Sequence, residues 1–286
     1  MFDYKKAFSR NIGWVSDDEL LTLKDKKVAI AGAGGVGGEH LVTLTRLGIS
    51  NFNIADFDHF EVHNFNRQAG AFMSTIGQPK LSTMKNIALD INPEMQIKTF
   101  DEGINATNIE AFLDGVDIYV DSLDFFAFDA RRLVFDKCHE LGIPIVTAAP
   151  VGMGCAFLCF LPGQMSPEEY FGFGAAKNED EAHIKFYIGL APSMLQKGSL
   201  VVPEAADIIN KKLPSTPMGI KLCAGVAGSY VLKILLGRGE VLAAPHGLHF
   251  DAYKNKFKKT WRPLGYRHPQ QRLSLFLAKK VLLAKL

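Results

Sequence analysis

The sequence predicts an α/β fold: a doubly wound, mostly parallel sheet with an antiparallel extension toward the C-terminus. Three observations predict it. Short apolar runs alternate with helical stretches between residues 28 and 148, which is typical of parallel strands joined by crossover helices. A glycine-rich turn at residues 32–37 joins the first apolar run to the first long helical stretch. A further apolar run at residues 155–161 is interpreted as an antiparallel strand.

Length and composition indicate a soluble globular protein. The chain has 286 residues, of which 48% are hydrophobic and 22% charged, so it can bury a sizeable core. The formal net charge is +2 and no block of like charges stands out, so a nucleic-acid partner is not expected. The N-terminus lacks the apolar stretch of a signal peptide, and no run approaches the roughly 20 apolar residues of a membrane span. We therefore expect a cytoplasmic protein without a membrane partner.

The four cysteines indicate buried thiols rather than a metal site. Cys138 and Cys223 lie in expected helices, and Cys155 and Cys159 lie four positions apart in an apolar, strand-like run. No pair has the C-x-x-C spacing, so a structural zinc site is not expected. Reduced, mostly buried thiols also agree with a cytoplasmic location.

The first part of the chain is expected to form a strand–helix–strand unit. Ser16 is a suitable cap for a short helix. The expected elements are a helix at residues 17–23, a strand at 28–31, a helix at 38–47 and a strand at 52–55.

The glycine turn of this unit can bind a nucleotide. Gly32, Gly34, Gly35 and Gly37 let the backbone turn tightly and approach a ligand, because no Cβ is in the way. The following helix presents free N–H groups and the positive end of its dipole to phosphate. Asp56, 24 positions after the first glycine, can accept hydrogen bonds from ribose hydroxyls. The unit alone does not distinguish NAD from ATP, and a glycine turn without a ligand is the structural alternative.

A polar segment and a lysine follow the second strand. Residues 57–68 are irregular and lie at the carboxyl end of a strand, where open α/β sheets place ligands. Pro79 fits the first turn of a helix that extends to about residue 91, which places Lys80 at the N-terminus of this helix. A lysine is unfavourable at that end of the helix dipole, so an anion is expected to offset its charge.

Two acidic residues follow a later strand. The expected elements here are a strand at residues 96–100, a helix at 105–113, a strand at 116–120, a helix at 126–141 and a strand at 143–148. Asp121 and Asp124 fall just past the carboxyl end of the strand at 116–120, on the same sheet edge as the glycine turn. The structural alternative for Asp124 is a helix N-cap.

The remainder of the chain contains a long surface excursion and a second helical part. Residues 163–216 mix glycine, proline and charge, with one expected helix near 204–212. A long apolar helix is expected at 217–236, between a Thr216 cap and a Gly237 stop. Short strands are expected at 240–244, 248–253 and 256–261, and an apolar helix with basic residues at 270–286. This last helix is expected to pack on the protein or a partner subunit; a membrane surface is the alternative.

These residues, taken as an ordered set, resemble the ThiF/MoeB/HesA family, the bacterial relatives of ubiquitin-activating enzymes. The set consists of Gly32-Ala33-Gly34-Gly35-Val36-Gly37, Asp56-Phe57-Asp58, Asn64-Phe65-Asn66-Arg67-Gln68, Gly77-Gln78-Pro79-Lys80, Asn92-Pro93 and Asp121-Ser122-Leu123-Asp124. The resemblance covers residues 8–162 well and residues 217–237 fairly. It is weak over 163–216 and the last 40 or so residues.

The resemblance implies ATP-dependent adenylation of a carboxylate, often the C-terminal glycine of a small ubiquitin-like protein. It assigns nucleotide binding to Gly32, Gly34, Gly35, Gly37, Asp56, Asp58, Asn64, Arg67, Lys80 and Asp124. Arg67 and Lys80 would neutralise the triphosphate, and Asp124 would bind Mg²⁺. The attacking carboxylate is already ionised at pH 7, so no general base is needed.

The resemblance also implies a subunit arrangement and a domain plan. Arg10 matches a family arginine that reaches the ATP of the other subunit, so a homodimer is expected; a solvated surface charge is the alternative. Residues 1–162 would be the adenylation domain with an N-terminal arm, and 163–216 the excursion. Residues 217–286 would complete the same domain.

Three departures from the family pattern bear on the substrate. Zinc-binding C-x-x-C pairs are absent, residues 163–216 contain no cysteine for a thioester, and Asp124 precedes Phe125 where the family commonly has Asp-Asn. Adenylation without an enzyme thioester is therefore expected, on a ubiquitin-like protein, a peptide or a small molecule. The alternatives are a dehydratase of a tRNA nucleoside, an NAD-dependent oxidoreductase, which would not account for Arg67 and Lys80, and a non-catalytic nucleotide-binding module.

Overall fold

The computed structural model describes residues 1–206 and 213–283. These residues form a sheet with the strand order β3-β2-β1-β4-β5-β6-β7-β8. The strands are β1 (Lys27–Ala31), β2 (Asn51–Ala55), β3 (Gln96–Phe100), β4 (Ile118–Asp121), β5 (Ile145–Val151), β6 (Gly154–Phe160), β7 (His246–Asp251) and β8 (Lys256–Trp261). The first five strands are parallel, and β6, β7 and β8 continue the sheet antiparallel. The predicted fold class is confirmed.

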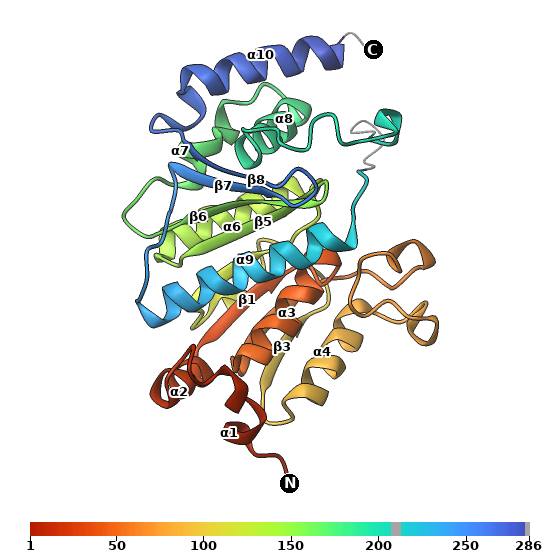
Figure 1. Ribbon diagram of the computed structural model, residues 1–286, viewed down its shortest axis with the longest axis vertical. Helices are drawn as coiled ribbons and strands as arrows, with labels where there is room; N and C mark the ends of the chain where they lie inside the picture. The colour runs from red at the N-terminus through yellow and green to blue at the C-terminus, as the bar shows by residue number, and fades with distance from the viewer. Residues whose placement is uncertain (207–212, 284–286) are drawn as a thin grey trace.

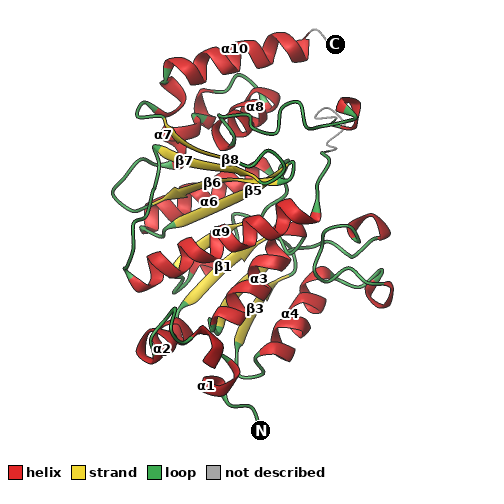
Figure 2. Cartoon of the chain, in the orientation of Figure 1, coloured by secondary structure: helices red, strands yellow, loops and turns green. Residues whose placement is uncertain are grey.

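Helices cover both faces of the sheet (Figures 1 and 2). Side chains alternate between faces along each strand. In β1, Val28 and Ile30 belong to one buried cluster, and Ala29 and Ala31 to the other. The first cluster is covered by α1 (Tyr4–Ala7), α2 (Asp17–Asp25), α3 (Gly35–Leu47), α4 (Lys80–Ile91) and α9 (Pro217–Leu236). The second is covered by α5 (Ile109–Leu113), α6 (Phe128–Leu141), α7 (Pro167–Phe171) and α8 (Glu179–Leu190). A final helix, α10 (Pro269–Leu283), packs against α8.

The long helix α9 corrects one expectation about membrane segments. It has the expected Thr216 cap and ends at Gly237 in a left-handed conformation. By length and composition α9 could cross a membrane, although the sequence was expected to contain no such run. In the structure it packs against α3, β5 and β6, and half of its apolar window is buried (Figure 1). A helix buried in a protein core can be as long and as apolar as a membrane-spanning helix, so these two properties do not distinguish them.

The excursion contains more regular structure than expected. It contains α7 and α8, which the sequence patterns missed, and a 3-10 turn at Pro203–Ala205. The helix expected near residues 204–212 falls mostly on residues 207–212, which lie outside the described part of the chain. Both α7 and α8 begin with a side-chain cap, Ser166 and Asn178 respectively.

Several other boundaries differ from expectation. The strand expected at residues 240–244 is wrong: that segment forms no strand, although the Ala244 N–H donates to the Cys159 carbonyl at 2.7 Å. The helices α5 and α6 begin later than expected, at Ile109 and Phe128. Asp121 is the last residue of β4 and is buried, rather than lying past the strand end.

Candidate active site

The glycine turn follows β1 and packs closely against Ser122 and Leu123, the residues that follow β4. Gly32 has φ +92°, in the left-handed region. A Cβ on Gly32 would lie 2.2 Å from the Ser122 carbonyl oxygen, and a Cβ on Gly37 would lie 1.7 Å from the Gly32 carbonyl oxygen. The turn therefore needs glycine at both positions. Gly34 is the N-cap of α3 and has no side chain to occupy the N–H groups of the first turn, which suits an anion.

Asp56 joins this turn to the loop after β2. One carboxylate oxygen accepts the Ala33 N–H at 2.6 Å, and the other accepts the Asp58 N–H at 2.8 Å. Each oxygen retains a further acceptor site. These free sites could accept ribose hydroxyls. The carboxylate also joins the glycine turn to the loop after β2, a structural role that the sequence did not reveal.

Lys80 is buried at the start of α4 and pairs with Asp58. The two side-chain atoms Nζ and Oδ2 are 2.9 Å apart, and only 8% of the lysine side chain is exposed against 54% for the aspartate. The Lys80 N–H also donates to the Asp58 carbonyl at 2.9 Å. The anion expected beside this lysine is thus supplied, in the protein alone, by Asp58.

Arg67 lies between the glycine turn and Asp124. Its Cγ is 3.8 Å from the position of a Cβ on Gly35, and its guanidinium donates to the His63 carbonyl at 2.9 Å. Burial lowers the pKa of Arg67, and the nearby Asp124 carboxylate raises it. Asn64 is buried and accepts the Glu61 N–H at 2.9 Å through its side chain, so in the protein alone it shapes this loop.

Asp124 does not cap a helix. The N-cap of α6 is Ala127, whereas the Asp124 carboxylate accepts the Phe126 N–H at 2.9 Å in an Asx turn. The side chain is exposed. The loop therefore presents a carboxylate to solvent at the carboxyl end of β4, beside the glycine turn and Arg67.

Two residues that the sequence analysis gave no role also lie at the turn. Gln68 Oε1 and Ser122 Oγ are buried and have no hydrogen-bond partner within residues 1–206 and 213–283. Gln68 Nε2 is 3.5 Å from the position of a Cβ on Gly34. Buried polar atoms are normally paired, so these atoms are candidates to contact a bound nucleotide. The sequence could have indicated them only by position, because Gln68 follows Arg67 and Ser122 follows Asp121.

Arg10 is not brought to this site within one chain. It is exposed in the 3-10 turn at Ser9–Asn11, and its neighbour Asn11 donates to the Arg46 carbonyl at 2.9 Å. Arg46 is in the last turn of α3, whereas the glycine turn is at the first. Thirteen helical residues separate the two ends by about 20 Å.

The four cysteines are free and buried, as expected. Burial raises the pKa of Cys159 to about 12, and burial also raises the pKa of Cys223, with a smaller contribution from Cys155. A thiol in such surroundings is a poor nucleophile. Among the residues that the structure describes, no group of three His, Cys, Asp or Glu side chains is placed to hold a metal ion.

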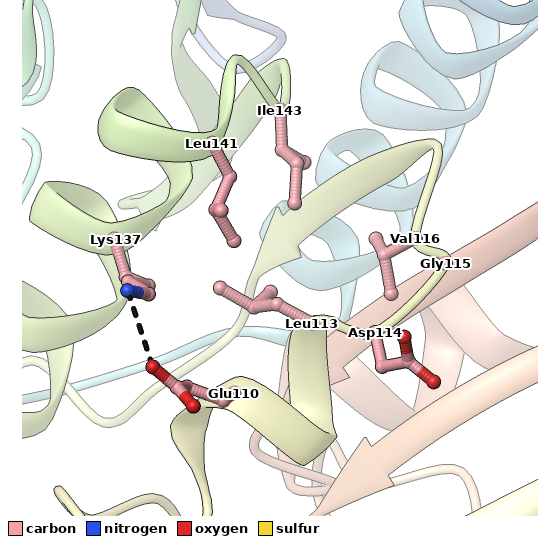
Figure 3. Close-up of a pocket in the computed structure, with 8 residues that line it drawn as sticks. All are labelled: Glu110, Leu113, Asp114, Gly115, Val116, Lys137, Leu141 and Ile143. Carbon is pink, nitrogen blue, oxygen red and sulfur yellow. Dashed lines mark ion pairs between the residues drawn. The ribbon is translucent and has the colours of Figure 1, made fainter.

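A pocket elsewhere in the protein does not include these residues. Figure 3 shows it between the end of α5, the turn before β4 and the end of α6, with the Lys137–Glu110 ion pair at 3.5 Å on its wall. Gly115 and Val116 line it, and they precede β4. The pocket therefore lies at the amino edge of the sheet, opposite the glycine turn.

The fold and the site define an α/β protein of a nucleotide-binding class, in which basic and acidic side chains lie at the same sheet edge as a glycine turn. The family model described as "ThiF family" matches residues 8–273, and the chain belongs to this family.

Curated relatives carry two kinds of name. The chain is 34% identical over 142 residues to a tRNA threonylcarbamoyladenosine dehydratase of Bacillus subtilis, a match that covers 49% of this chain and 55% of the relative. It is 27% identical over 253 residues to a sulfur carrier protein adenylyltransferase of Thermus thermophilus, covering 83% of this chain and 79% of the relative. The chain therefore matches only part of the length of the first relatives. The match covers 55% of the Bacillus subtilis protein and 36% of the Culex quinquefasciatus protein.

Solved structures share the fold. E. coli MccB with ATP superposes with a TM-score of 0.66 at 22% identity, covering 91% of this chain and 71% of that one. E. coli tRNA N6-threonylcarbamoyladenosine dehydratase superposes with a TM-score of 0.59 at 21% identity, covering 82% and 95%.

Proposed function

We propose that this protein is an ATP- and Mg²⁺-dependent adenylyltransferase that converts a carboxylate substrate into an acyl-adenylate with release of pyrophosphate. One observation carries the proposal: Arg67, Lys80 and the exposed carboxylate of Asp124 lie at the same edge of the sheet as the glycine turn. The name of the Thermus thermophilus relative, which aligns with 83% of this chain, supports it.

Each side chain has a task in this reaction. The backbone of the turn and the N-terminus of α3 would receive the phosphates. Arg67 and Lys80 would balance the charge of the triphosphate as the carboxylate oxygen attacks the α-phosphorus and the bond to pyrophosphate breaks. Lys80 would exchange its Asp58 partner for phosphate oxygens. Asp56 would accept hydrogen bonds from the ribose while it holds the turn through the Ala33 N–H.

The exposed carboxylate of Asp124 fits a magnesium ion. Mg²⁺ is usually held by one or two carboxylates together with substrate phosphates and water. Asp124 offers this kind of ligand, since its loop is fixed through the backbone and the side chain remains exposed. A bound Mg²⁺ would screen the charge of the departing pyrophosphate.

We propose a protein or peptide C-terminus as the carboxylate, as in ubiquitin-like modifier activation, and a cytoplasmic homodimer as the working form. The Thermus thermophilus relative is named for a sulfur carrier protein, and MccB is seen in complex with MccA. Arg10 lies far from the turn of its own chain, so it could reach a nucleotide only in a partner subunit.

Calorimetry with separate nucleotides tests the proposal. ATP with Mg²⁺ is expected to bind with micromolar affinity, and NAD is expected not to bind, because Arg67, Lys80 and Asp124 suit a triphosphate with a metal ion. A Lys80→Ala variant is the control and should lose ATP affinity. Binding of NAD or NADH without binding of ATP would contradict the proposal.

A tRNA threonylcarbamoyladenosine dehydratase is the second candidate. The observation in its favour is the 34% identity with the Bacillus subtilis enzyme over 142 residues. Incubation with ATP and tRNA carrying the modified nucleoside, followed by nucleoside mass analysis, separates the two. Dehydration of the nucleoside would establish the second candidate.

Removal of all four thiols is expected to leave the reaction intact. The sequence of residues 163–216 contains no cysteine. The thiols of Cys138, Cys155, Cys159 and Cys223 are buried. All four cysteines are replaced by serine, and circular dichroism checks that the variant is folded. The folded variant should retain pyrophosphate release. A single Cys223→Ser variant is the milder comparison. A reducible enzyme–substrate adduct that is lost in Cys223→Ser would instead establish a thioester route.

A further inference from the structure

The loop that presents Asp124 has few fixed points of its own. It runs between the end of β4 and the start of α6, and neither element includes it. Within the loop, the Ala127 N–H donates to the Asp124 carbonyl at 3.0 Å and the Phe126 N–H donates to the Asp124 carboxylate. A carboxylate that must bind a metal ion in a fixed geometry needs more support than these short-range bonds provide.

Arg131 supplies that support from the second turn of α6. One guanidinium nitrogen donates to the Leu123 carbonyl at 2.6 Å and to the Asp124 carbonyl at 3.0 Å, and another donates to the Phe125 carbonyl at 3.3 Å. The Nε atom donates to the Asp121 carboxylate at 3.0 Å. Only 3% of the Arg131 side chain is exposed. The guanidinium fork thus holds three consecutive carbonyls of the loop and the last residue of β4.

The excursion closes this arrangement from the other side. The Phe186 ring of α8 lies 4.4 Å from the guanidinium carbon of Arg131. Phe125 packs against the same helix, with its ring 5.6 Å from Phe186 and stacked at 6.0 Å on His183. Phe125 is the residue that departs from the Asp-Asn pattern of the family. Its side chain anchors the loop to α8 instead of pointing toward the glycine turn.

We propose that Arg131 is a positioning residue for the metal-binding carboxylate of Asp124, and that α8 covers it as part of the same support. The Arg131 guanidinium is occupied by Asp121 and three loop carbonyls, so Arg131 acts through the loop backbone. The inference rests on the proposed function, since it concerns how Asp124 is held for Mg²⁺. It gives the excursion a direct link to the active site: displacement of α8 would uncover the guanidinium that holds the loop.

The test measures ATP affinity with and without Mg²⁺ in an Arg131→Lys variant of the full chain. A lysine keeps the positive charge beside Asp121 but lacks the planar fork that reaches three carbonyls. Affinity for ATP with Mg²⁺ is expected to fall about 10-fold, while affinity for ATP in EDTA changes less than about twofold. Arg132→Lys is the matched control, because Arg132 is half-exposed on α6 and pairs with Asp136 in its own helix. This control should behave as the unchanged protein.

A double variant shows whether the effect passes through Asp124. If it does, Arg131→Lys should cause no further loss of Mg²⁺-dependent affinity in an Asp124→Asn background. Hydrogen exchange of the nucleotide-free protein gives a second readout: amides of residues 123–127 should exchange faster in Arg131→Lys and at the usual rate in Arg132→Lys. If Arg131→Lys does not fold, Phe186→Leu removes the covering ring and should weaken Mg²⁺-dependent affinity about threefold.

The failures of the two proposals are distinguishable. Equal losses with and without Mg²⁺, additive effects of the two variants, or an unchanged Mg²⁺ dependence in both Arg131→Lys and Phe186→Leu would overturn the positioning role. Absence of ATP binding by the unchanged protein would overturn the proposed function and this inference with it.

Discussion

Replacement of Asp124 by alanine is expected to reduce pyrophosphate release at least about 100-fold while the protein remains folded. The exposed carboxylate lies beside Arg67 and the glycine turn, where a metal ion would contribute several kcal/mol to the stabilisation of transition-state charge. Only the hydrogen bond to the Phe126 N–H is lost from the fold, which corresponds to about 1 kcal/mol. The measurement is pyrophosphate release with a carboxylate substrate that supports turnover by the unchanged protein.

The matched control for this variant is Asp129→Ala. Asp129 is an exposed carboxylate in the first turn of α6, five positions further along the chain. Its removal should affect stability slightly and turnover hardly at all. If Asp124→Ala and Asp129→Ala both keep full turnover and melt earlier, the carboxylate of Asp124 has a structural role only.

Two inactive variants are expected to restore activity when they are mixed. Arg10→Ala and Lys80→Ala should each be inactive alone, because in the proposed homodimer a complete site takes Arg10 from one subunit and Lys80 from the other. In a mixed dimer one site lacks both side chains and the other lacks neither. Random assortment of equal amounts should therefore give about a quarter of the unchanged turnover. The measurement is pyrophosphate release after subunit exchange confirmed by native mass spectrometry.

Arg67→Ala mixed with Lys80→Ala is the control for this experiment. Both side chains belong to the same site on one subunit: Arg67 lies against Gly35, and Lys80 pairs with Asp58 next to the Asp56 that holds the turn. Every site in a mixed dimer therefore lacks one of them. No activity should return. Absence of rescue in the Arg10 mixture, with exchange demonstrated, would show that Arg10 is a solvated surface charge.

The sequence predicted the parallel half of the fold well because its patterns are local. The short apolar run of β1 and the glycine turn before α3 mark these elements without reference to the rest of the chain. The helix α8 was missed because nearly every side of it is buried, including the charged residues Glu181 and Lys185, so no polar stripe reveals its helical period. Residues 240–244 have the composition of a strand, but they do not pair with a strand of the sheet.

The placement of several candidate residues at one edge of the sheet could be predicted from sequence, but their pairings could not. Spacing alone points to Asp56, Lys80 and Asp124 at one sheet edge, because parallel strands end there together. The bonds of Asp56 to the Ala33 N–H and of Lys80 to Asp58 depend on loop geometry that no local pattern encodes. Arg131 had no signal at all, since an arginine within a helix usually indicates a solvated face.

The packing of α9 has a consequence for the order in which the chain can fold. Cys223, Ala227 and Val231 of this helix belong to the same buried cluster as Val28 of β1 and Phe157 of β6. We propose on this basis that residues 217–286 complete the domain begun by residues 1–162. During synthesis the first half cannot close its apolar face, because the helix that covers it is made after residue 216. The apolar face under α9 is therefore expected to stay uncovered, and prone to aggregation, until residues 217–236 have been synthesised.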